Sequence, residues 1–307
     1  MKKLALLFLF ILFFQVHSQV NRFVYEVRFV KDTISKNSFT NIYFLDINLK
    51  NVKFFNQELY EVDSTQNVTK QFDSRISIAN SLMIKRNIPS FENENFVFVD
   101  TDYLQYKSED KQVWKISSET KSLKNYSLQK ATTEFGGRKW IAWFSKDFPI
   151  NQGPYKFQGL PGLIFQIEDD RKQYSFNLIE VKKLDKEYDT SRILESNFNK
   201  KAIPISLEKY NKILLNSYNN PFSEIRSKLD KGQDYTFSAY GKDIKTVKDL
   251  DELRKVIQQE KRKNYNPIEL DKAVKFTEKY RSNLFLQIKF GLDCQKRLQV
   301  HSKLPKS

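Results

Sequence analysis

Histidine and cysteine are scarce in this chain of 307 residues, which has two histidines and one cysteine. His17 lies near the N-terminus and His301 near the C-terminus, so the central part of the chain can assemble no Ser–His or Cys–His catalytic unit. The shortage also excludes a histidine-based zinc site, and the lone Cys294 can form neither a thiolate cluster nor an internal disulfide. We therefore expect no metal and no cofactor, and a fold that an ordinary hydrophobic core stabilises.

Long apolar runs are also absent, apart from one at the N-terminus. Lys2 and Lys3 precede an apolar run over residues 4–14, and Val16-His17-Ser18 provides a small-residue cleavage site. A bilayer span needs about 20 residues, so the run predicts a secretory signal peptide over residues 1–18, with an uncleaved anchor as the alternative. No cysteine follows the run, so we do not expect a lipoprotein. The sequence predicts an exported protein, periplasmic, extracellular or at the cell surface after cleavage near Ser18, with no transmembrane segment.

The net charge is positive, at +15 from 52 basic and 37 acidic residues. Residues 271–307 carry nine Lys or Arg and three acids, a net of +6, and Lys2 and Lys3 carry +2, which leaves 15 − 6 − 2 = +7 for residues 19–270. Basic residues in that body are dispersed rather than arranged in a stripe beside aromatics, so we expect no nucleic-acid binding. A solvated surface explains the charge, and weak attraction to anionic lipid or polysaccharide is the alternative.

Short segments with a period of two predict an antiparallel sheet. The first runs over residues 23–30, and others are rich in β-branched or aromatic residues: 42–47, 82–85, 95–100, 103–107 and 112–117. Two hairpins follow, because residues 124–134 and 138–146 flank Gly136–Gly137, and residues 163–168 and 174–182 flank a polar turn.

The period then changes to that of amphipathic helices. Leu207, Tyr210, Leu214 and Tyr218 share one face after the capping residue Ser206. A second helix follows, with Asp249 or Asp251 at its start and an end before Pro267. Strands followed by helices predict an α+β fold, mainly a curved, half-barrel-like antiparallel β-sheet with a C-terminal pair of helices packed on it. We assign residues 19–270 to this single domain and residues 271–307 to a basic C-terminal extension.

A loop rich in proline and glycine joins the two hairpins. Residues 147–162, the signature loop, contain three of the eight prolines and three of the eight glycines of the chain. Pro161 presets one backbone angle and Gly162 can take the positive φ of a type II turn, so we expect an ordered turn. Its structural residues are expected to be Gly159, Pro161, Gly162, Leu163 and Ile164.

The string Gly-Leu-Pro-Gly-Leu-Ile at residues 159–164 resembles the signature of the GLPGLI family of secreted bacterial proteins. Similar features are Trp114-Lys115-Ile116, Gln129-Lys130-Ala131-Thr132-Thr133, residues 137–144 and 147–150, and the ending at residues 266–270. The resemblance covers roughly residues 103–182 well. It implies secretion and no established activity. A cysteine that the family often carries is replaced by Ser127 or Leu128, so a redox or disulfide role is not expected.

Aromatic residues provide the candidate binding site. Trp140 and Trp143 must point to opposite faces of one strand. If the signature loop is locally extended, Tyr155 and Phe157 share one side of it while Lys156 and Gln158 face away. With Leu160 they are candidate contacts for an apolar ligand or a partner. Packing of these rings in the core under the loop is the alternative.

Three functions remain open for an exported protein of the cell envelope. The first is a non-enzymatic binding protein for an apolar ligand or an outer-membrane or other envelope protein. The second is an assembly or accessory subunit that docks through the signature loop. The third is a carboxylate-dependent hydrolase, which needs two converging acids. The adjacent Glu168, Asp169 and Asp170 lie where a hairpin turns, which favours a structural role.

Overall fold

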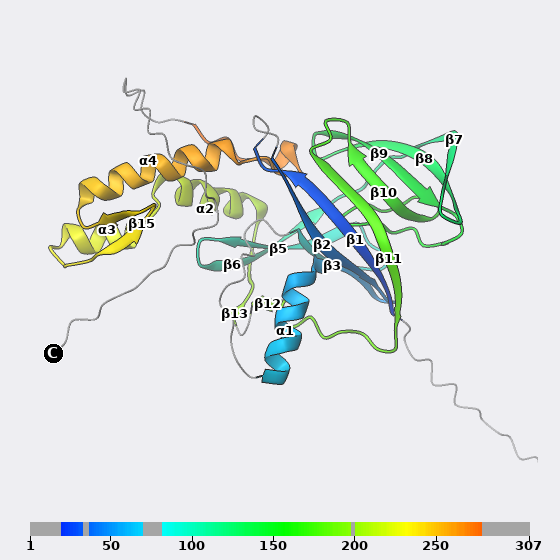
Figure 1. Cartoon of the computed structure of the whole chain (residues 1–307), viewed down its shortest axis with the longest axis horizontal. Helices are drawn as coiled ribbons and strands as arrows, with labels where there is room; N and C mark the ends of the chain where they lie inside the picture. The colour runs from blue at the N-terminus through cyan, green and yellow to red at the C-terminus, as the bar shows by residue number, and fades with distance from the viewer. Residues whose placement is uncertain (1–19, 33–36, 70–81, 198–199, 278–307) are drawn as a thin grey trace, which may run out of the picture.

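The computed structural model describes residues 20–32, 37–69, 82–197 and 200–277, and its largest element is one twelve-stranded sheet (Figure 1). The strand order is β14-β6-β5-β4-β3-β2-β1-β11-β10-β9-β8-β7. The first six strands are β1 (Val20–Val30), β2 (Ser38–Ile47), β3 (Asn51–Asn56), β4 (Met83–Asn87), β5 (Glu92–Val99) and β6 (Asp102–Glu109). The next five are β7 (Lys115–Leu123), β8 (Tyr126–Phe135), β9 (Arg138–Ser145), β10 (Leu163–Asp169) and β11 (Tyr174–Leu184), and the short β14 (Ile203–Ile205) completes the sheet.

The sheet consists of two antiparallel meanders that meet along β1 and β11. Val27 pairs with Phe176 at this seam, and β14 forms the only parallel pair of the described sheet, with β6. Both predicted hairpins are present as β8–β9 and β10–β11. Gly136 and Gly137 form the first turn with φ values of 63° and 71°, which explains why two glycines stand there. The predicted α+β class with a mainly antiparallel sheet is confirmed.

The connection from β6 to β7 requires the sheet to curl. These strands are ten steps apart in the sheet order, so a flat sheet would separate them by about 48 Å. Only residues 110–114 join them, and five extended residues reach roughly 18 Å. The two meanders must therefore bend toward each other, and the sheet acquires a concave inner face.

The signature loop fills that inner face. Phe157 is fully buried, and its ring centroid lies 4.7 Å from that of Trp140 and 6.1 Å from that of Phe176. Trp114 Nε1 donates a hydrogen bond of 2.8 Å to the Gln158 carbonyl and fixes the loop from the β6–β7 connection. Leu160 is 1% exposed within the same core cluster, so the loop occupies space that an open half-barrel would leave empty.

Gly162 is required for a reason other than the one we expected. The glycines with positive φ are at other positions, among them Gly159 at 96°, so the prediction of a positive φ at Gly162 is wrong. A Cβ atom at Gly162 would lie 2.1 Å from the Ser145 carbonyl oxygen. The side chain is therefore excluded by the close approach of the last residue of β9.

The signature loop is not extended around Tyr155, so the condition under which Tyr155 and Phe157 would share one side is not met. Tyr155 has a φ of 54°, so the chain turns there and residues 155–158 do not alternate between two sides. Tyr155, Lys156, Phe157 and Gln158 are all buried, whereas we expected Lys156 and Gln158 to face away from the core. A buried lysine needs partners, and the described residues supply them, as shown below.

Four α-helices accompany the described part of the sheet, and the two predicted ones are present (Figure 1). In α2 (Leu207–Asn219) the side chain of Ser206 caps the start by accepting from Lys209 N, as predicted, and the helix packs on β5 and β6. A capping box of Thr246 and Asp249 begins α4 (Val247–Lys263), which contacts α2 and α3 (Ser223–Asp230). The sequence did not predict α3, nor α1 (Gln57–Thr69), which packs on β2 and β3. The remaining elements are β12 (Ser196–Asn197), β13 (Lys200–Lys201), β15 (Phe237–Ala239), β16 (Lys242–Ile244) and a 3₁₀ turn (Leu270–Lys272).

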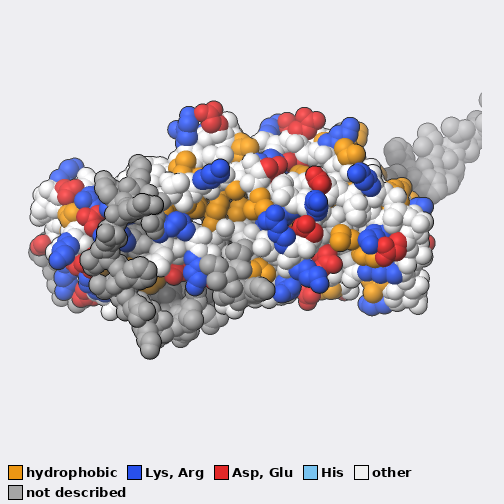
Figure 2. All heavy atoms as spheres, turned by 90° about the horizontal axis from the view of Figure 1, so that it is seen from above, with side chains coloured by type: hydrophobic (Ala, Val, Ile, Leu, Met, Phe, Trp, Pro, Cys, Tyr) orange, Lys and Arg blue, Asp and Glu red, His pale blue; other side chains and the backbone are white. Residues whose placement is uncertain are grey.

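The surface carries charges of both signs. Figure 2 shows lysines and arginines interspersed with acids on one face, and hydrophobic side chains gathered near its middle. In the described ranges, no helix has the length and apolar character needed to cross a membrane. The expected signal peptide, both histidines, Cys294 and residues 278–307 lie outside these ranges.

Residues after Leu270 belong to the fold, so the expected domain boundary at that residue is too early. Lys272 Nζ lies 2.5 Å from Asp110 Oδ1, and Val274 is 8% exposed. The Phe276 ring lies 4.5 Å from the Tyr218 ring and 4.6 Å from the Tyr265 ring, measured between centroids. The expectation of a dispensable extension now applies only to residues 278–307.

A chain that ends at Leu270 is expected to unfold at a lower temperature than one that ends at Thr277. Loss of the Val274 and Phe276 contacts should lower the free energy of unfolding by about 2 kcal/mol. Thermal unfolding of both chains beside the full chain measures this difference. Identical midpoints for the two shortened chains would show that residues 271–277 add nothing to stability.

Candidate functional site

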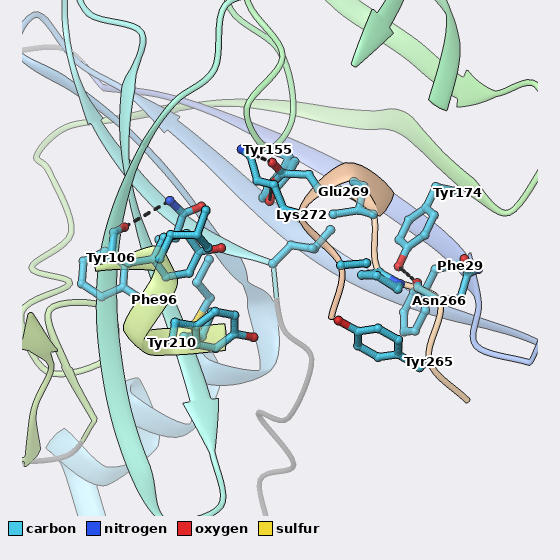
Figure 3. Close-up of a pocket in the computed structure, with 18 of the residues that line it drawn as sticks. Phe29, Phe96, Tyr106, Tyr155, Tyr174, Tyr210, Tyr265, Asn266, Glu269 and Lys272 are labelled. Atoms are coloured by element: carbon cyan, nitrogen blue, oxygen red, sulfur yellow. Dashed lines mark hydrogen bonds and ion pairs between the residues drawn. The ribbon is translucent and has the colours of Figure 1, made fainter. Parts of the chain in front are cut away.

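A cleft lined by six tyrosines lies between the sheet, α2 and the segment that follows α4 (Figure 3). We call it the tyrosine cleft. Its tyrosines come from distant parts of the chain: Tyr43, Tyr106, Tyr155, Tyr174, Tyr210 and Tyr265. Phe29 and Phe96 complete the aromatic lining. The Tyr106 and Tyr210 rings stack with centroids 5.1 Å apart, which joins β6 to α2 at one side of the cleft.

The volume of the cleft limits what it can hold. It measures about 190 Å³. Sites for drug-sized molecules usually have about 300 to 1,000 Å³, whereas an apolar cavity of about 150 Å³ binds benzene. The tyrosine cleft therefore has room for a group of the size of one ring, and it is too small for a lipid tail.

Two hydroxyl groups in the cleft are available for hydrogen bonding. Tyr155 and Tyr174 use their hydroxyls within the protein, to Glu269 and to the Asn266 carbonyl, at 2.6 and 2.7 Å. Tyr106 and Tyr210 have no such partner among the described residues. Burial raises the pKa of Tyr210 to about 12 and raises the pKa of Tyr106 well above its ordinary value. Both phenols are therefore protonated at neutral pH and can donate hydrogen bonds.

One wall of the cleft is built on a cluster of four charged side chains, which we call the buried ionic cluster: Asp110, Lys156, Glu269 and Lys272. Lys156 Nζ lies 2.6 Å from Glu269 Oε1 and 3.2 Å from Asp110 Oδ2. Lys272 contacts the same two carboxylates. Two ammonium groups thus bridge two carboxylates, and the cluster is neutral as a whole.

The electrostatics of the cluster favour a structural role. Burial raises the pKa of Asp110, but Lys156, Lys272 and the Ser108 hydroxyl outweigh burial and hold this pKa below its ordinary value. Burial lowers the pKa of Lys272, but Glu269 and Asp110 outweigh it and leave that pKa raised. A general acid needs a carboxyl group with a raised pKa. Asp110 has the opposite shift, and its oxygens are already occupied.

Arg138 connects this wall to the sheet. Its guanidinium pairs with Asp169 at 2.8 Å, and both side chains are fully buried. It also donates to Asn266 Oδ1 at 2.7 Å and to the Pro267 and Ile268 carbonyls at 2.8 and 2.9 Å. Asp169 additionally accepts from two backbone amides of its hairpin turn. The acid that the sequence placed in a turn is therefore part of the support for the cleft.

The aromatic residues that the sequence singled out do not form one site. Tyr155 lines the tyrosine cleft. Trp140, Phe157 and Leu160 are buried in the core under the signature loop, at 0%, 0% and 1% exposure. Trp143 lies elsewhere on β9, where Lys121 Nζ is 4.1 Å from its ring centroid. Leu163 and Ile164 are fully buried at the start of β10.

The sequence did not identify most residues of the tyrosine cleft as parts of a site. Tyr106 and Tyr210 belonged to segments that periodicity explained as strand and helix, so nothing marked them as a site. Glu269 lies in the segment 266–270 that resembled the family ending, which was the single signal available for it. A second hollow of about 550 Å³ surrounds the Gly136–Gly137 turn and is lined by acids and bases in equal number. The described residues contain no cluster of three or more His, Cys, Asp or Glu side chains that could hold a metal ion.

Comparisons with known proteins give a family match for only part of the chain. A sequence profile described as a protein of unknown function (Porph_ging) matches residues 136–166, from the first hairpin turn through the signature loop into β10. This agrees with a family of unknown function but does not identify the GLPGLI family in particular. No curated protein matches the chain.

Two crystal structures of PNGF-II, in different space groups, are similar to the chain at 18% sequence identity, with TM-scores of 0.47 and 0.46. Each alignment covers 66% of this chain and 34% of the PNGF-II chain. The match thus spans about a third of the length of that protein.

Proposed function

We propose that this protein is an exported, non-enzymatic binding protein of the cell envelope, and that its tyrosine cleft holds a ligand with one ring-sized apolar group. The observation that carries the proposal is an aromatic cleft of about 190 Å³ in which the Tyr106 and Tyr210 hydroxyls have no partner among the described residues. Aromatic walls provide apolar contact, and a few fixed polar groups orient the ligand. Export rests on the N-terminal sequence, and the link to secreted proteins rests on the GLPGLI-like signature.

The other two functions have less support. Docking through the signature loop would need its apolar residues at the surface, but Phe157 and Leu160 are buried. A carboxylate-dependent hydrolase would use a pair such as Asp110 and Glu269. Both carboxylates are bridged by Lys156 and Lys272, which leaves neither of them free to transfer a proton.

Binding of benzyl alcohol tests the proposal, because this neutral probe combines one ring with one hydrogen-bond acceptor. We expect saturable binding of one molecule per chain in calorimetry and in ligand-observed NMR. Tyr210→Phe removes one hydroxyl and should weaken binding about three- to tenfold. Tyr240→Phe is the matched control, because Tyr240 lies outside the cleft and is 59% exposed.

A substitution that fills the cleft provides a second test. Ala273 lines the cleft, so Ala273→Leu should reduce benzyl alcohol binding while the protein remains folded, as thermal unfolding would verify. The neutral long-chain probe 1-decanol should bind weakly at best. Tight binding of 1-decanol that Ala273→Leu leaves unchanged would contradict a ring-sized site and favour lipid carriage elsewhere.

A further inference from the structure

One positive charge in the tyrosine cleft has no counter-charge among the residues that the structure describes. Lys31 lines the cleft, and among the described residues its ammonium group has no carboxylate partner; it lies 4.4 Å from the centroid of the Phe39 ring and 5.8 Å from that of Phe29. The adjacent acid Asp32 instead contacts Lys263, at 3.5 Å. Cation–π contacts leave the ammonium able to donate hydrogen bonds to an anion.

The remaining charges that line the cleft cancel. Glu269 and Lys272 line it, and both belong to the neutral buried ionic cluster. Glu269 accepts from the Tyr155 hydroxyl and from Lys156 at 2.6 Å each, and it also contacts Lys272. Its negative charge is therefore compensated within the protein and does not offset that of Lys31.

Two of the three uncharged polar groups that lack a side-chain partner among the described residues of the cleft also favour an anionic ligand. Tyr106 and Tyr210 are protonated phenols that can donate hydrogen bonds. Asn211 also lines the cleft, and its Oδ1 is buried without a partner among the described residues. A side-chain amide offers both a donor and an acceptor, so Asn211 accepts either kind of ligand group. The Lys31 ammonium and the two phenols, in contrast, are hydrogen-bond donors, and they favour a ligand group that accepts several hydrogen bonds and carries negative charge.

We infer that the tyrosine cleft selects a small aryl carboxylate, with the ring among the tyrosines and the carboxylate facing Lys31 and the phenol hydroxyls. The inference rests on the proposed function, because it specifies the ligand of the same cleft. A carboxylate has two oxygens and about four acceptor sites, so it can accept from more than one of the three donor groups that line the cleft. A hydrogen bond between charged partners is stronger than one between neutral groups. The charge of the ligand would therefore determine which ring compounds bind most tightly, and the cleft volume would limit the ligand to one ring.

Phenylacetate, benzyl alcohol and benzylamine test the inference, since they share one ring and differ in charge. Calorimetric titration of the full chain should show phenylacetate binding about tenfold tighter than benzyl alcohol, and benzylamine weakest. Added salt should weaken phenylacetate binding and leave benzyl alcohol binding unchanged. In Lys31→Met the affinity for phenylacetate should fall to that for benzyl alcohol, whose own affinity stays constant.

Lys107→Met is the matched control, because Lys107 is 61% exposed in its side chain, pairs with Glu92 and lies outside the cleft. The Lys107→Met protein should bind phenylacetate more tightly than benzyl alcohol by the same factor as the natural protein. Equal affinities for phenylacetate and benzyl alcohol, or a Lys31→Met protein with unchanged selectivity, would overturn the inference and leave the proposed function standing. If none of the three probes binds, both the inference and the proposed function are wrong.

Discussion

Replacing Gly162 by alanine is expected to lower the free energy of unfolding by more than about 3 kcal/mol, at the upper end of the cost of overpacking. The added Cβ would lie 2.1 Å from the Ser145 carbonyl oxygen and 2.7 Å from its carbon. These are backbone atoms of β9, so no side-chain rotation can relieve the contact. Either β9 or the signature loop must shift, and both belong to the main core. Urea or thermal unfolding of the variant measures the loss.

Gly232→Ala is the control that separates this steric effect from backbone strain. Gly232 has a φ of 71°, and a Cβ there would meet no atom within 4 Å. Alanine at that site costs only the left-handed conformation, about 1 kcal/mol. If Gly162→Ala were no more destabilising than Gly232→Ala, the close approach of β9 to the loop would not hold in solution.

The local elements could be predicted from the sequence wherever a local signal exists. Adjacent glycines predicted the β8–β9 turn, and Ser206 predicted the start of α2, because turn and cap chemistry depend on neighbouring residues. The helix α1 has no such signal. Leu59 of this helix is 1% exposed, and the helix packs on β2 and β3. Its apolar pattern is weak, so this packing rather than a local signal determines that the segment is helical.

The tyrosine cleft could not be predicted in the same way. Its six tyrosines come from β2, β6, the signature loop, β11, α2 and the segment after α4, and only the folded chain brings these together. Each tyrosine fits its own element as an ordinary aromatic residue. The lack of histidine between His17 and His301 could be read from composition alone, whereas the place and size of the cleft depend on tertiary packing.

Lys156 illustrates the difference most directly. A lysine between two aromatics in a loop is normally solvated, and we expected it to face away from the core. It is instead fully buried, because Glu269, 113 residues later, and Asp110 neutralise its charge. Three separate parts of the sequence thus meet in the buried ionic cluster: the β6–β7 connection, the signature loop and the segment 269–272.

Lys156→Met is expected to lower the free energy of unfolding at pH 7 by roughly 3 to 5 kcal/mol, the usual cost of removing one partner from a buried ion pair. Methionine replaces most of the volume of the aliphatic stem, so the loss reports on charge. Asp110 and Glu269 would then share Lys272 alone. Denaturant unfolding at pH 7 measures the effect. Lys107→Met, which removes an exposed lysine, should leave the midpoint unchanged.

The pH dependence of this loss distinguishes charge from packing. In the natural protein the pKa of Asp110 lies below its ordinary value of 3.8, so its ionised form stabilises the fold above that pH, and the contribution disappears as pH falls through the folded-state pKa. Without Lys156 the folded-state pKa of Asp110 rises and this contribution shrinks. The two proteins should therefore differ most above about pH 4 and converge below it. A difference in stability that stays constant from pH 7 to pH 3 would show that Lys156 acts through the packing of its stem and not through its charge.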